Sequence, residues 1–516
     1  MAKVKQELVI DDSRLTLAEL DYFLRENPTV SLAPGSVRRI NEGRKVIESI
    51  LKEGRVVYGV NTGFGKFADV RIKPEQTEDL QRRLVLSHAA GVGEPIPQPI
   101  VRLMMLLKVK NLSQGYSGVR LETVRQLIDL LNHGIIPVIP SKGSVGASGD
   151  LAPLAHMALV MMGEGRAYVQ GEVLNGSDAL KKFGLKPLKF AAKEGLAVLN
   201  GTQAIQAYGS YALLRAEQLV KTADVIGAMS LEALLGTLTA FDPRIQQVRH
   251  HPGQMTVSEN FRALLADSPI VESHRYSDHR VQDAYSLRCV PQVHGAVRDG
   301  LEHVRSVFLR EINGVTDNPL VFTDNGDVLS GGNFHGEPVA MAADYLSILM
   351  AELGNLSERR LEHMMDPHIS EMAGFLTEEG GLNSGFMIAH VTAAALVSEN
   401  KVLAHPASVD SIPTSANKED HVSMGTHAAR KALQIIENVE NILAVELIAA
   451  AQALDLRAPL TPAPATAQVL SLVRSQIAHW KEDRLMHTEI DKAREMIRSG
   501  AVLQAVQKGK QGVTVK

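Results

Sequence analysis

The sequence has little cysteine, few aromatic residues and no excess of charge of one sign. The single cysteine, Cys289, excludes an intrachain disulfide and a cluster of thiolate metal ligands within one chain. Aromatic residues make up 4% of the 516 residues, so the core must be mostly aliphatic and rich in alanine, as in packed helices. The net charge is −4, and no long basic run points to a nucleic-acid or anionic-membrane partner.

Long apolar runs are also missing. No uncharged apolar stretch reaches the length of a transmembrane helix, and the start, MAKVKQELVIDD, lacks the apolar segment of a secretory signal. The 18 histidines include no HExxH or HxxxH pair on a plausible helix, so we expect no metal site. These absences favour a soluble, cytoplasmic protein.

The two parts of the chain differ in character. Residues 1–205 mix short elements with loops rich in glycine and proline, and VVYGVNTGFG (56–65) begins like a strand. Residues 206–516 are dominated by long helical patterns. We therefore predict a mainly α protein, with an N-terminal mixed domain over 1–205 and a long-helix bundle over 206–516.

The helical patterns are specific enough to give boundaries. We expect helices over 36–54, 204–229, 338–365 and 426–458. The last contains no glycine or proline, and it should stop at Ala458 because Pro459 follows. Its apolar residues recur every three or four positions and form one stripe, which consists of Ile436, Val439, Leu443, Leu447 and Ala450.

Residues 143–150, GSVGASGD, concentrate glycine and serine directly before an apolar segment. One interpretation is an ordinary loop that leads into a helix, with Ser148 or Asp150 as the N-cap and Pro153 in the first turn. The stretch matches neither GxGxxG nor GxxxxGK[ST], so we set nucleotide binding aside.

A second interpretation concerns the triplet Ala147-Ser148-Gly149. Gly149 has no Cβ, so its amide nitrogen can approach the carbonyl carbon of Ala147 closely. Ser148 carries a β-hydroxyl that can leave as water. Cyclisation and dehydration would give a five-membered ring with an exocyclic C=C bond, a strong electrophile of a kind that no side chain supplies.

Eight blocks that follow one another between residues 56 and 425 extend this pattern. They are VVYGVNTGFG, VLSHAAGVGEP, GSVGASGDLAPLAH, LNGTQA, QDAYSLRCVPQVHG, TDNPL, GGNFHG and SANKEDHVSMG. Together they resemble the aromatic amino acid ammonia-lyases, whose Ala-Ser-Gly triplet forms the prosthetic group 4-methylidene-imidazol-5-one (MIO). The resemblance implies the helical architecture shared by ammonia-lyases and fumarases, no external cofactor, and a homotetramer whose active sites draw residues from three subunits.

The same resemblance implies roles for individual residues. Tyr58 is similar to the family's catalytic base, and Asn200 to the residue that donates to the MIO carbonyl oxygen. Arg288 resembles the clamp for the substrate carboxylate, with Gln282 and Tyr285 lining the same pocket. Tyr285 is expected to act in catalysis by holding the MIO or the substrate through its hydroxyl. On a helix these three residues would share a face. Phe334, in GGNFHG, is similar to a residue that forms an apolar wall of the pocket.

Two positions bear on the substrate. His88, in the Ser87-His88 pair, and Glu419, in KED, resemble the histidine-specific members, which convert L-histidine to trans-urocanate and ammonia. A carboxylate that faces imidazole is reasonable, because imidazole has an N–H donor and can carry positive charge. Lys418 is a departure, since the family pattern has glutamine there, and this change bears on substrate affinity.

Alternatives remain open on the sequence alone. The chain could be a tyrosine or phenylalanine ammonia-lyase or an aminomutase of the same family, or a non-catalytic helical scaffold in which the triplet stays an unmodified loop. The GSSxMPxKxN loop of fumarases and aspartases has no match. The resemblance leaves two chemical routes, in which either the substrate amine or its aromatic ring attacks the electrophile.

Overall fold

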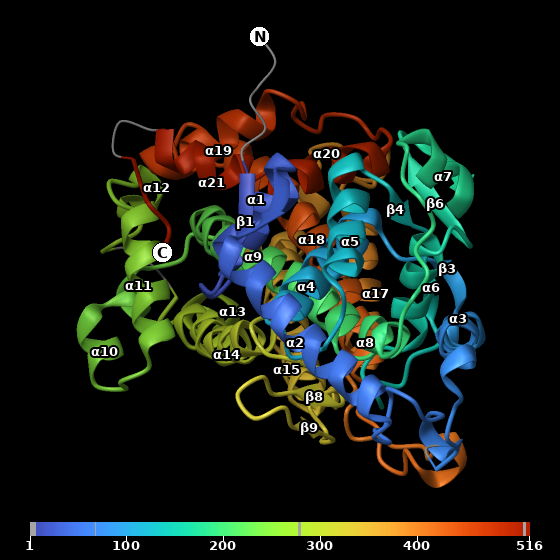
Figure 1. Cartoon of the computed structure of the whole chain (residues 1–516). Helices are drawn as coiled ribbons and strands as arrows, with labels where there is room; N and C mark the ends of the chain where they lie inside the picture. The colour runs from blue at the N-terminus through green and yellow to red at the C-terminus, as the bar shows by residue number, and fades with distance from the viewer. Residues whose placement is uncertain (1–6, 68, 277–279, 509–511) are drawn as a thin grey trace. The chain divides into compact units, whose positions relative to one another are not determined.

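The chain folds mainly into helices, as predicted, and most of its short strands lie within the first 175 residues (Figure 1). The computed structural model describes residues 7–67, 69–276, 280–508 and 512–516. The strands are β1 (Glu7–Ile10), β2 (Thr29–Leu32), β3 (Val92–Pro95), β4 (Ile136–Pro137), β5 (Pro140–Lys142), β6 (Arg166–Val169), β7 (Glu172–Asn175), β8 (Leu320–Val321) and β9 (Val328–Leu329).

The helices include short connecting elements and long core elements. They are α1 (Leu17–Glu26), α2 (Pro34–Glu53), α3 (Thr77–His88), α4 (Gln98–Ser113), α5 (Leu121–His133), α6 (Ala152–Met161), α7 (Gly176–Lys182), α8 (Glu194–Leu199), α9 (Gln203–Ala233), α10 (Pro243–Gln247), α11 (Pro252–Leu264), α12 (Pro269–Ser273), α13 (Tyr285–Arg288), α14 (Val290–Glu311), α15 (Glu337–Met365), α16 (Pro367–Ser370), α17 (Met387–Leu403), α18 (Gly425–Leu456), α19 (Pro464–Arg474), α20 (Met486–Arg498) and α21 (Ala501–Lys508).

The sheets are small, and their short strands lie in the segments that connect the helices. β1 and β2 pair in parallel, whereas β3 with β5, β4 with β6, β6 with β7, and β8 with β9 are antiparallel. The three-stranded sheet β4-β6-β7 contacts α7 (Figure 1). β5 ends at Lys142, so it delivers the chain directly to the glycine-rich stretch 143–150.

Compact packing divides the chain into two units that interleave along the sequence. The first unit holds Met1–Tyr211, Arg305–Asp344 and Pro406–Arg430, and the second holds Ala212–Val304, Tyr345–His405 and Lys431–Lys516. The first unit thus contains the expected N-terminal segment together with two later segments. The division at residue 205 into two contiguous domains stays a prediction.

The predicted long helices are confirmed, with small shifts at their ends. The helix expected over 36–54 is α2, which ends where Gly54 takes a left-handed conformation with φ 69°. The segments 204–229 and 338–365 lie within α9 and α15. α18 ends at Leu456, two residues before the expected stop, and all five residues of its apolar stripe are buried.

A buried ion pair joins the long helices inside the second unit. Arg360 on α15 donates from Nε to Oε1 of Glu446 on α18 at 2.6 Å, and both side chains are fully buried. The hydroxyl of Ser230 on α9 also donates to Oε1 of Glu446 at 2.6 Å. A buried charge is tolerated only when its partners satisfy it, so this carboxylate fixes three helices in one register.

The strand expected at the start of 56–65 is absent, and this prediction is wrong. The segment forms a turn, because the Asn61 side chain accepts from the Val57 N–H at 2.9 Å and donates to the Arg55 carbonyl at 2.8 Å. Such local bonds replace the ladder that a strand would need. Val60 packs with Ile47 in a buried apolar cluster, so the turn is anchored to α2.

One helix of the described residues, α15, is long and apolar enough to cross a membrane by length and composition. Within its most apolar window, 67% of the residues are buried inside the protein. A core helix passes the same test, so α15 is weak evidence for a membrane span.

Candidate active site

The triplet 147–149 lies in a tight turn held against residues 200–201. Gly149 has φ 73°, and the next residue, Asp150, donates its N–H to the Gly201 carbonyl at 2.8 Å. In return, the Gly201 N–H donates to the Ser148 carbonyl at 3.3 Å. A Cβ on Gly149 would lie 2.1 Å from the Gly201 oxygen, so only glycine fits this turn.

The expected capping role of Ser148 or Asp150 toward the following helix is wrong. α6 has Leu151 at its N-cap and no side-chain capping bond, although Pro153 does occupy the first turn. The Asp150 carboxylate points elsewhere because another helix start lies closer.

Asp150 instead caps α9. Its Oδ2 accepts from the N–H of Ala204 at 2.6 Å and of Ile205 at 3.3 Å, and its Oδ1 accepts from the Thr426 hydroxyl at 2.9 Å. Burial raises the pKa of Asp150 to about 7, against these hydrogen bonds, which favour the ionised form. The residue therefore ties the triplet to the starts of α9 and α18.

The hydroxyl of Ser148 contacts a carboxylate from a distant part of the chain. Ser148 Oγ donates to Oε1 of Glu419 at 2.9 Å. The other oxygen, Oε2, accepts from the hydroxyls of Thr414 at 2.7 Å and Ser415 at 2.9 Å. Three hydroxyls thus orient Glu419 toward the triplet.

His88 lies at the end of α3, close enough to Glu419 for their charges to interact. Burial lowers the pKa of His88, while the hydrogen bond to the Leu84 carbonyl and the charge of Glu419 act in the opposite direction. Its Nδ1 is 2.8 Å from that carbonyl oxygen. Ser148 thus contacts Glu419, and the charge of Glu419 favours the protonated form of His88. That these residues bind an imidazole ring stays a prediction.

Tyr58 is half-buried in the turn that precedes the 3₁₀ segment Gly65–Phe67, and its hydroxyl accepts from the Gly65 N–H at 3.4 Å. That 3₁₀ segment contacts residues Ser415–Asn417, which precede Glu419. The Tyr58 turn and the Glu419 segment are thus neighbours in the first unit.

Asn200 is buried beside the triplet. Its Nδ2 donates to the Asn318 carbonyl at 2.8 Å and to Oδ1 of Asp317 at 3.3 Å. Asp317 also forms a fully buried ion pair with Lys193, with Nζ 2.7 Å from Oδ2. Burial acts to raise the pKa of Asp317, but the charges of Lys193 and Lys108 and the hydrogen bonds to the carboxylate together outweigh it, so this pKa is lowered.

The loop that carries Phe334 joins the same region. The Gly331 N–H donates to Oδ1 of Asn318 at 2.8 Å, and Nε2 of His335 lies 3.3 Å from the His421 carbonyl oxygen. Phe334 itself is half-buried. The blocks GGNFHG, TDNPL, LNGTQA and SANKEDHVSMG thus converge around the triplet, although more than 200 residues separate some of them.

The remaining expected residues lie in the second unit. α13 begins at Tyr285, so Gln282 precedes the helix and the expected shared face of Gln282, Tyr285 and Arg288 is wrong. The Arg288 guanidinium stacks on the Tyr285 ring, with its carbon 4.5 Å from the ring centre. Its buried Nε has no hydrogen-bond partner within the part of the chain that the structure describes. An unpaired guanidinium N–H suits the binding of a carboxylate.

The sequence did not predict the buried charged groups that lie close to Asn200. Besides Lys193 and Asp317, these include Lys108 on α4, whose Nζ donates to the carbonyls of Ala197 at 3.1 Å and Asn200 at 2.5 Å. Burial lowers the pKa of Lys108 to about 7. The available signal was a charge inside an apolar helical run, LMMLLKVKNL, which a soluble core helix rarely contains.

Comparison with known proteins decides the family. The family model described as "Aromatic amino acid lyase" matches residues 15–475. The chain belongs to the aromatic amino acid lyase family. It is 50% identical over 497 residues to the histidine ammonia-lyase of Caldanaerobacter subterraneus subsp. tengcongensis, an alignment that covers 96% of this chain and 97% of that relative.

Solved structures of the family share the fold. The histidine ammonia-lyase of Trypanosoma cruzi matches with a TM-score of 0.90 and 47% identity, over 97% of this chain and 95% of that chain. The tyrosine aminomutase of Streptomyces globisporus matches with a TM-score of 0.92 and 33% identity, over 99% and 100%. Backbone similarity alone therefore does not separate substrates within the family, and the side chains of the site must do so.

Proposed function

We propose that the protein is a carbon–nitrogen lyase that deaminates L-histidine non-oxidatively to trans-urocanate and ammonia, the first step of histidine degradation. The observation that carries this proposal is the contact of Ser148 Oγ with Glu419 at a turn that only Gly149 fits. The high identity to histidine ammonia-lyases over nearly the whole chain supports the same substrate.

The triplet has the features that cyclisation to MIO needs. The Gly149 nitrogen forms a bond to the Ala147 carbonyl carbon, and the carbonyl oxygen leaves as water with the N–H hydrogens of Gly149 and Ser148. Ser148 then loses its Cα hydrogen and its hydroxyl as a second water, which leaves the exocyclic C=C bond. No oxidant is needed. The buried left-handed turn at Gly149 and the contact of Ser148 Oγ with Glu419 both fit this chemistry.

When formed, the group supplies an electrophile to a bound amino acid, and the chain's own residues do the rest. Asn200 is buried beside the triplet, and we assign its side-chain amide to the ring carbonyl, which is that of Ser148, a role like that of an oxyanion hole. For this role its Nδ2 exchanges the longer of its two bonds, that of 3.3 Å to Oδ1 of Asp317. Tyr58 acts as the base that removes the substrate's β-hydrogen. Phe334 contributes an apolar wall.

Arg288 binds the substrate carboxylate through its guanidinium, which matches a carboxylate in bidentate fashion. The Tyr285 ring stacks on that guanidinium. We assign the Tyr285 hydroxyl to the substrate or the prosthetic group, and Gln282 to the same pocket. In this proposal the residues reach the triplet in the assembled oligomer.

Glu419 and His88 select the imidazole ring of histidine. Glu419 accepts a hydrogen bond from the ring N–H and stabilises positive charge on it. A phenyl ring offers neither interaction, and burial of a carboxylate against it is costly. Lys418 is exposed beside Glu419, so its charge is turned to solvent.

We further propose a homotetramer in the cytoplasm. The second unit exposes a line of residues on α17, with Ile388, Val391 and Val402 at 55–74% exposure and all on one helical face. Exposed apolar patches of this kind mark contacts between proteins. We assign this face to a second copy of the chain, since the family forms active sites from three subunits.

An assay with L-histidine, L-tyrosine and L-phenylalanine tests the function. We expect kcat/KM to be highest for histidine, with urocanate and ammonia formed in equal amounts. A higher kcat/KM for tyrosine or phenylalanine would move the protein to another branch of the family, and a β-amino acid product would make it an aminomutase. Absence of any turnover by protein with an unmodified triplet would favour the helical scaffold.

A further inference from the structure

The segment 200–201 is the surface against which the triplet turns. The Gly201 carbonyl accepts from the Asp150 N–H and faces the position that a Cβ of Gly149 would occupy. Because backbone atoms make these contacts, the shape of the turn depends on where the backbone of Asn200 and Gly201 is held.

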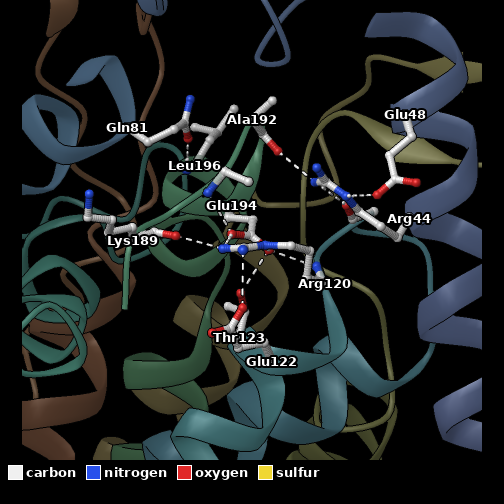
Figure 2. Close-up of polar contacts among 12 residues, drawn as sticks. Arg44, Glu48, Gln81, Arg120, Glu122, Thr123, Lys189, Ala192, Glu194 and Leu196 are labelled. Atoms are coloured by element: carbon white, nitrogen blue, oxygen red, sulfur yellow. Dashed lines mark hydrogen bonds and ion pairs between the residues drawn. The ribbon is translucent and has the colours of Figure 1, made fainter. Parts of the chain in front are cut away.

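That backbone follows α8, a short helix that is held at both ends. At its start, the buried Glu194 carboxylate accepts from the Arg120 guanidinium at 2.7 Å and from the Thr123 hydroxyl at 2.8 Å. Figure 2 shows these contacts, together with the bond from the Leu196 N–H to Oε1 of Gln81 at 3.3 Å. The start of α8 is therefore fixed by side chains of α3, of α5 and of Arg120, which precedes α5.

At its end, α8 depends on one ammonium group. The last carbonyls of a helix have no partners within the helix and need donors from elsewhere. Lys108 Nζ donates to one such carbonyl, that of Ala197, and to the carbonyl of Asn200, the residue that caps the helix. Lys108 is fully buried on α4. Burial lowers its pKa to about 7, whereas the charges of Asp317 and Asp150 favour its protonated form.

We infer that Lys108 is a positioning residue for formation of the prosthetic group. By holding the Asn200 carbonyl, its ammonium group keeps residues 200–201 pressed against Gly149, and it thereby keeps the Gly149 nitrogen close to the Ala147 carbonyl carbon. Lys108 touches neither reacting atom. This inference rests on the proposed conversion of the triplet.

A matched control lies two residues further along the same helix. Lys110 is also buried, and its Nζ also donates to two backbone carbonyls, those of Asp11 at 3.0 Å and Ser13 at 2.7 Å. These carbonyls belong to the N-terminal segment and not to the support of the triplet. Lys110→Met therefore removes a comparable buried ammonium without changing residues 200–201.

The test follows the mass of the peptide that contains residues 147–149 after cell-free synthesis of the full chain. Loss of two waters, about 36 Da, marks the converted triplet. At intervals after translation stops, the folded fraction is isolated by size exclusion and digested, and its melting temperature is recorded. We compare wild type with Lys108→Met, Lys108→Gln and Lys110→Met.

We expect conversion in folded Lys108→Met to be slower than in wild type by about tenfold or more, since a buried charged hydrogen-bond donor is lost. Lys110→Met should lower the melting temperature but convert at the wild-type rate. Conversion of folded Lys108→Met at the wild-type rate, or equal slowing by Lys110→Met, would overturn the inference.

If Lys108→Met does not fold, Lys108→Gln decides. Its side chain is one bond shorter, so its amide reaches one carbonyl at most, and we expect slowed conversion. A folded Lys108→Gln protein that converts like wild type overturns the inference. An unconverted triplet in folded wild-type protein is a separate outcome, which would refute the proposed function itself.

Discussion

Side chains from separate parts of the chain meet at the triplet. Ser148 Oγ donates to Glu419, and Asn200 is buried close to the triplet. In the proposed conversion, the Ser148 hydroxyl is the group that leaves. Tyr58 lies in a turn whose continuation contacts the Glu419 segment. This arrangement allows the roles of single residues to be tested separately.

The first test concerns Tyr58. Tyr58→Phe keeps the ring and removes the hydroxyl, so the triplet should still lose two waters. Turnover of histidine should fall by about 10²–10⁴-fold, the usual effect of losing a general base. The measurement is kcat with histidine, together with the mass of the 147–149 peptide. Wild-type kcat in this variant would remove Tyr58 from the mechanism.

The second test concerns the pH dependence that His88 confers. Burial lowers the pKa of His88 below 6.5, its ordinary value, so between the two values the unfolded chain binds more protons than the folded chain. The stability that neutral His88 contributes is therefore present above pH 6.5 and is lost as the pH falls through that value toward the pKa of the folded state.

Thermal unfolding of His88→Gln measures this effect. Between about pH 7.5 and about pH 5.5, the melting temperature of wild type should fall further than that of the variant. An equal fall in both proteins would show that His88 titrates alike in the folded and unfolded chain.

The turn at Gly149 depends on the absence of a Cβ atom at this position. Gly149→Ala places a Cβ 2.1 Å from the Gly201 oxygen and also forces alanine to a φ of 73°. Gly184 has nearly the same φ, 70°, but open space around it. Gly184→Ala therefore shares the backbone strain and lacks the clash.

We expect Gly184→Ala to lower stability by about 1–3 kcal/mol and to leave activity unchanged. Gly149→Ala should lose more stability and nearly all conversion of the triplet. The measurements are melting temperature and peptide mass. Equal behaviour of the two variants would mean that the contact with Gly201 does not shape the turn.

Elements with strong periodicity could be predicted from the sequence, and those made by local polar bonds could not. α18 follows from its apolar stripe and α2 from its glycine stop, because 3.6-residue spacing and a left-handed C-terminal residue are local properties. The apolar start of 56–65 is typical of a strand, yet the Asn61 side chain turns the chain there.

The candidate site could be predicted only in part, because some of its contacts join residues far apart in the sequence. The residues that carry family motifs, such as Ser148 and Glu419, could be named from the sequence. Lys108 could not, because its partners are backbone carbonyls 89 and 92 residues away. The sequence offers Asp150 or Ser148 as a cap for the helix that follows, whereas tertiary packing brings the start of α9 to the Asp150 carboxylate.

The complete molecule is expected to act only as an oligomer. Ile388 and Val391 lie one helical turn apart on α17 and are 63% and 55% exposed. The double variant Ile388→Glu, Val391→Glu should dissociate, because charges cannot be buried in an apolar contact. Light scattering coupled to size exclusion measures the mass, and turnover should be lost together with assembly.

The control for this variant is Leu485→Glu, since Leu485 is 75% exposed and lies outside α17. It should keep both the tetramer and the activity. A fully active monomer of the double variant would contradict shared active sites.

The proposed activity depends on the chemical state of three residues, and the mass of the peptide that spans them tests it most directly. In folded, assembled wild-type protein we predict that the mass of this peptide is about 36 Da below the mass that the sequence encodes. The Ser148→Ala variant should have a nearly unchanged fold, a triplet that has lost no water, and no turnover of histidine. Recovery of unmodified Ala147-Ser148-Gly149 from folded, assembled wild-type protein would contradict the account.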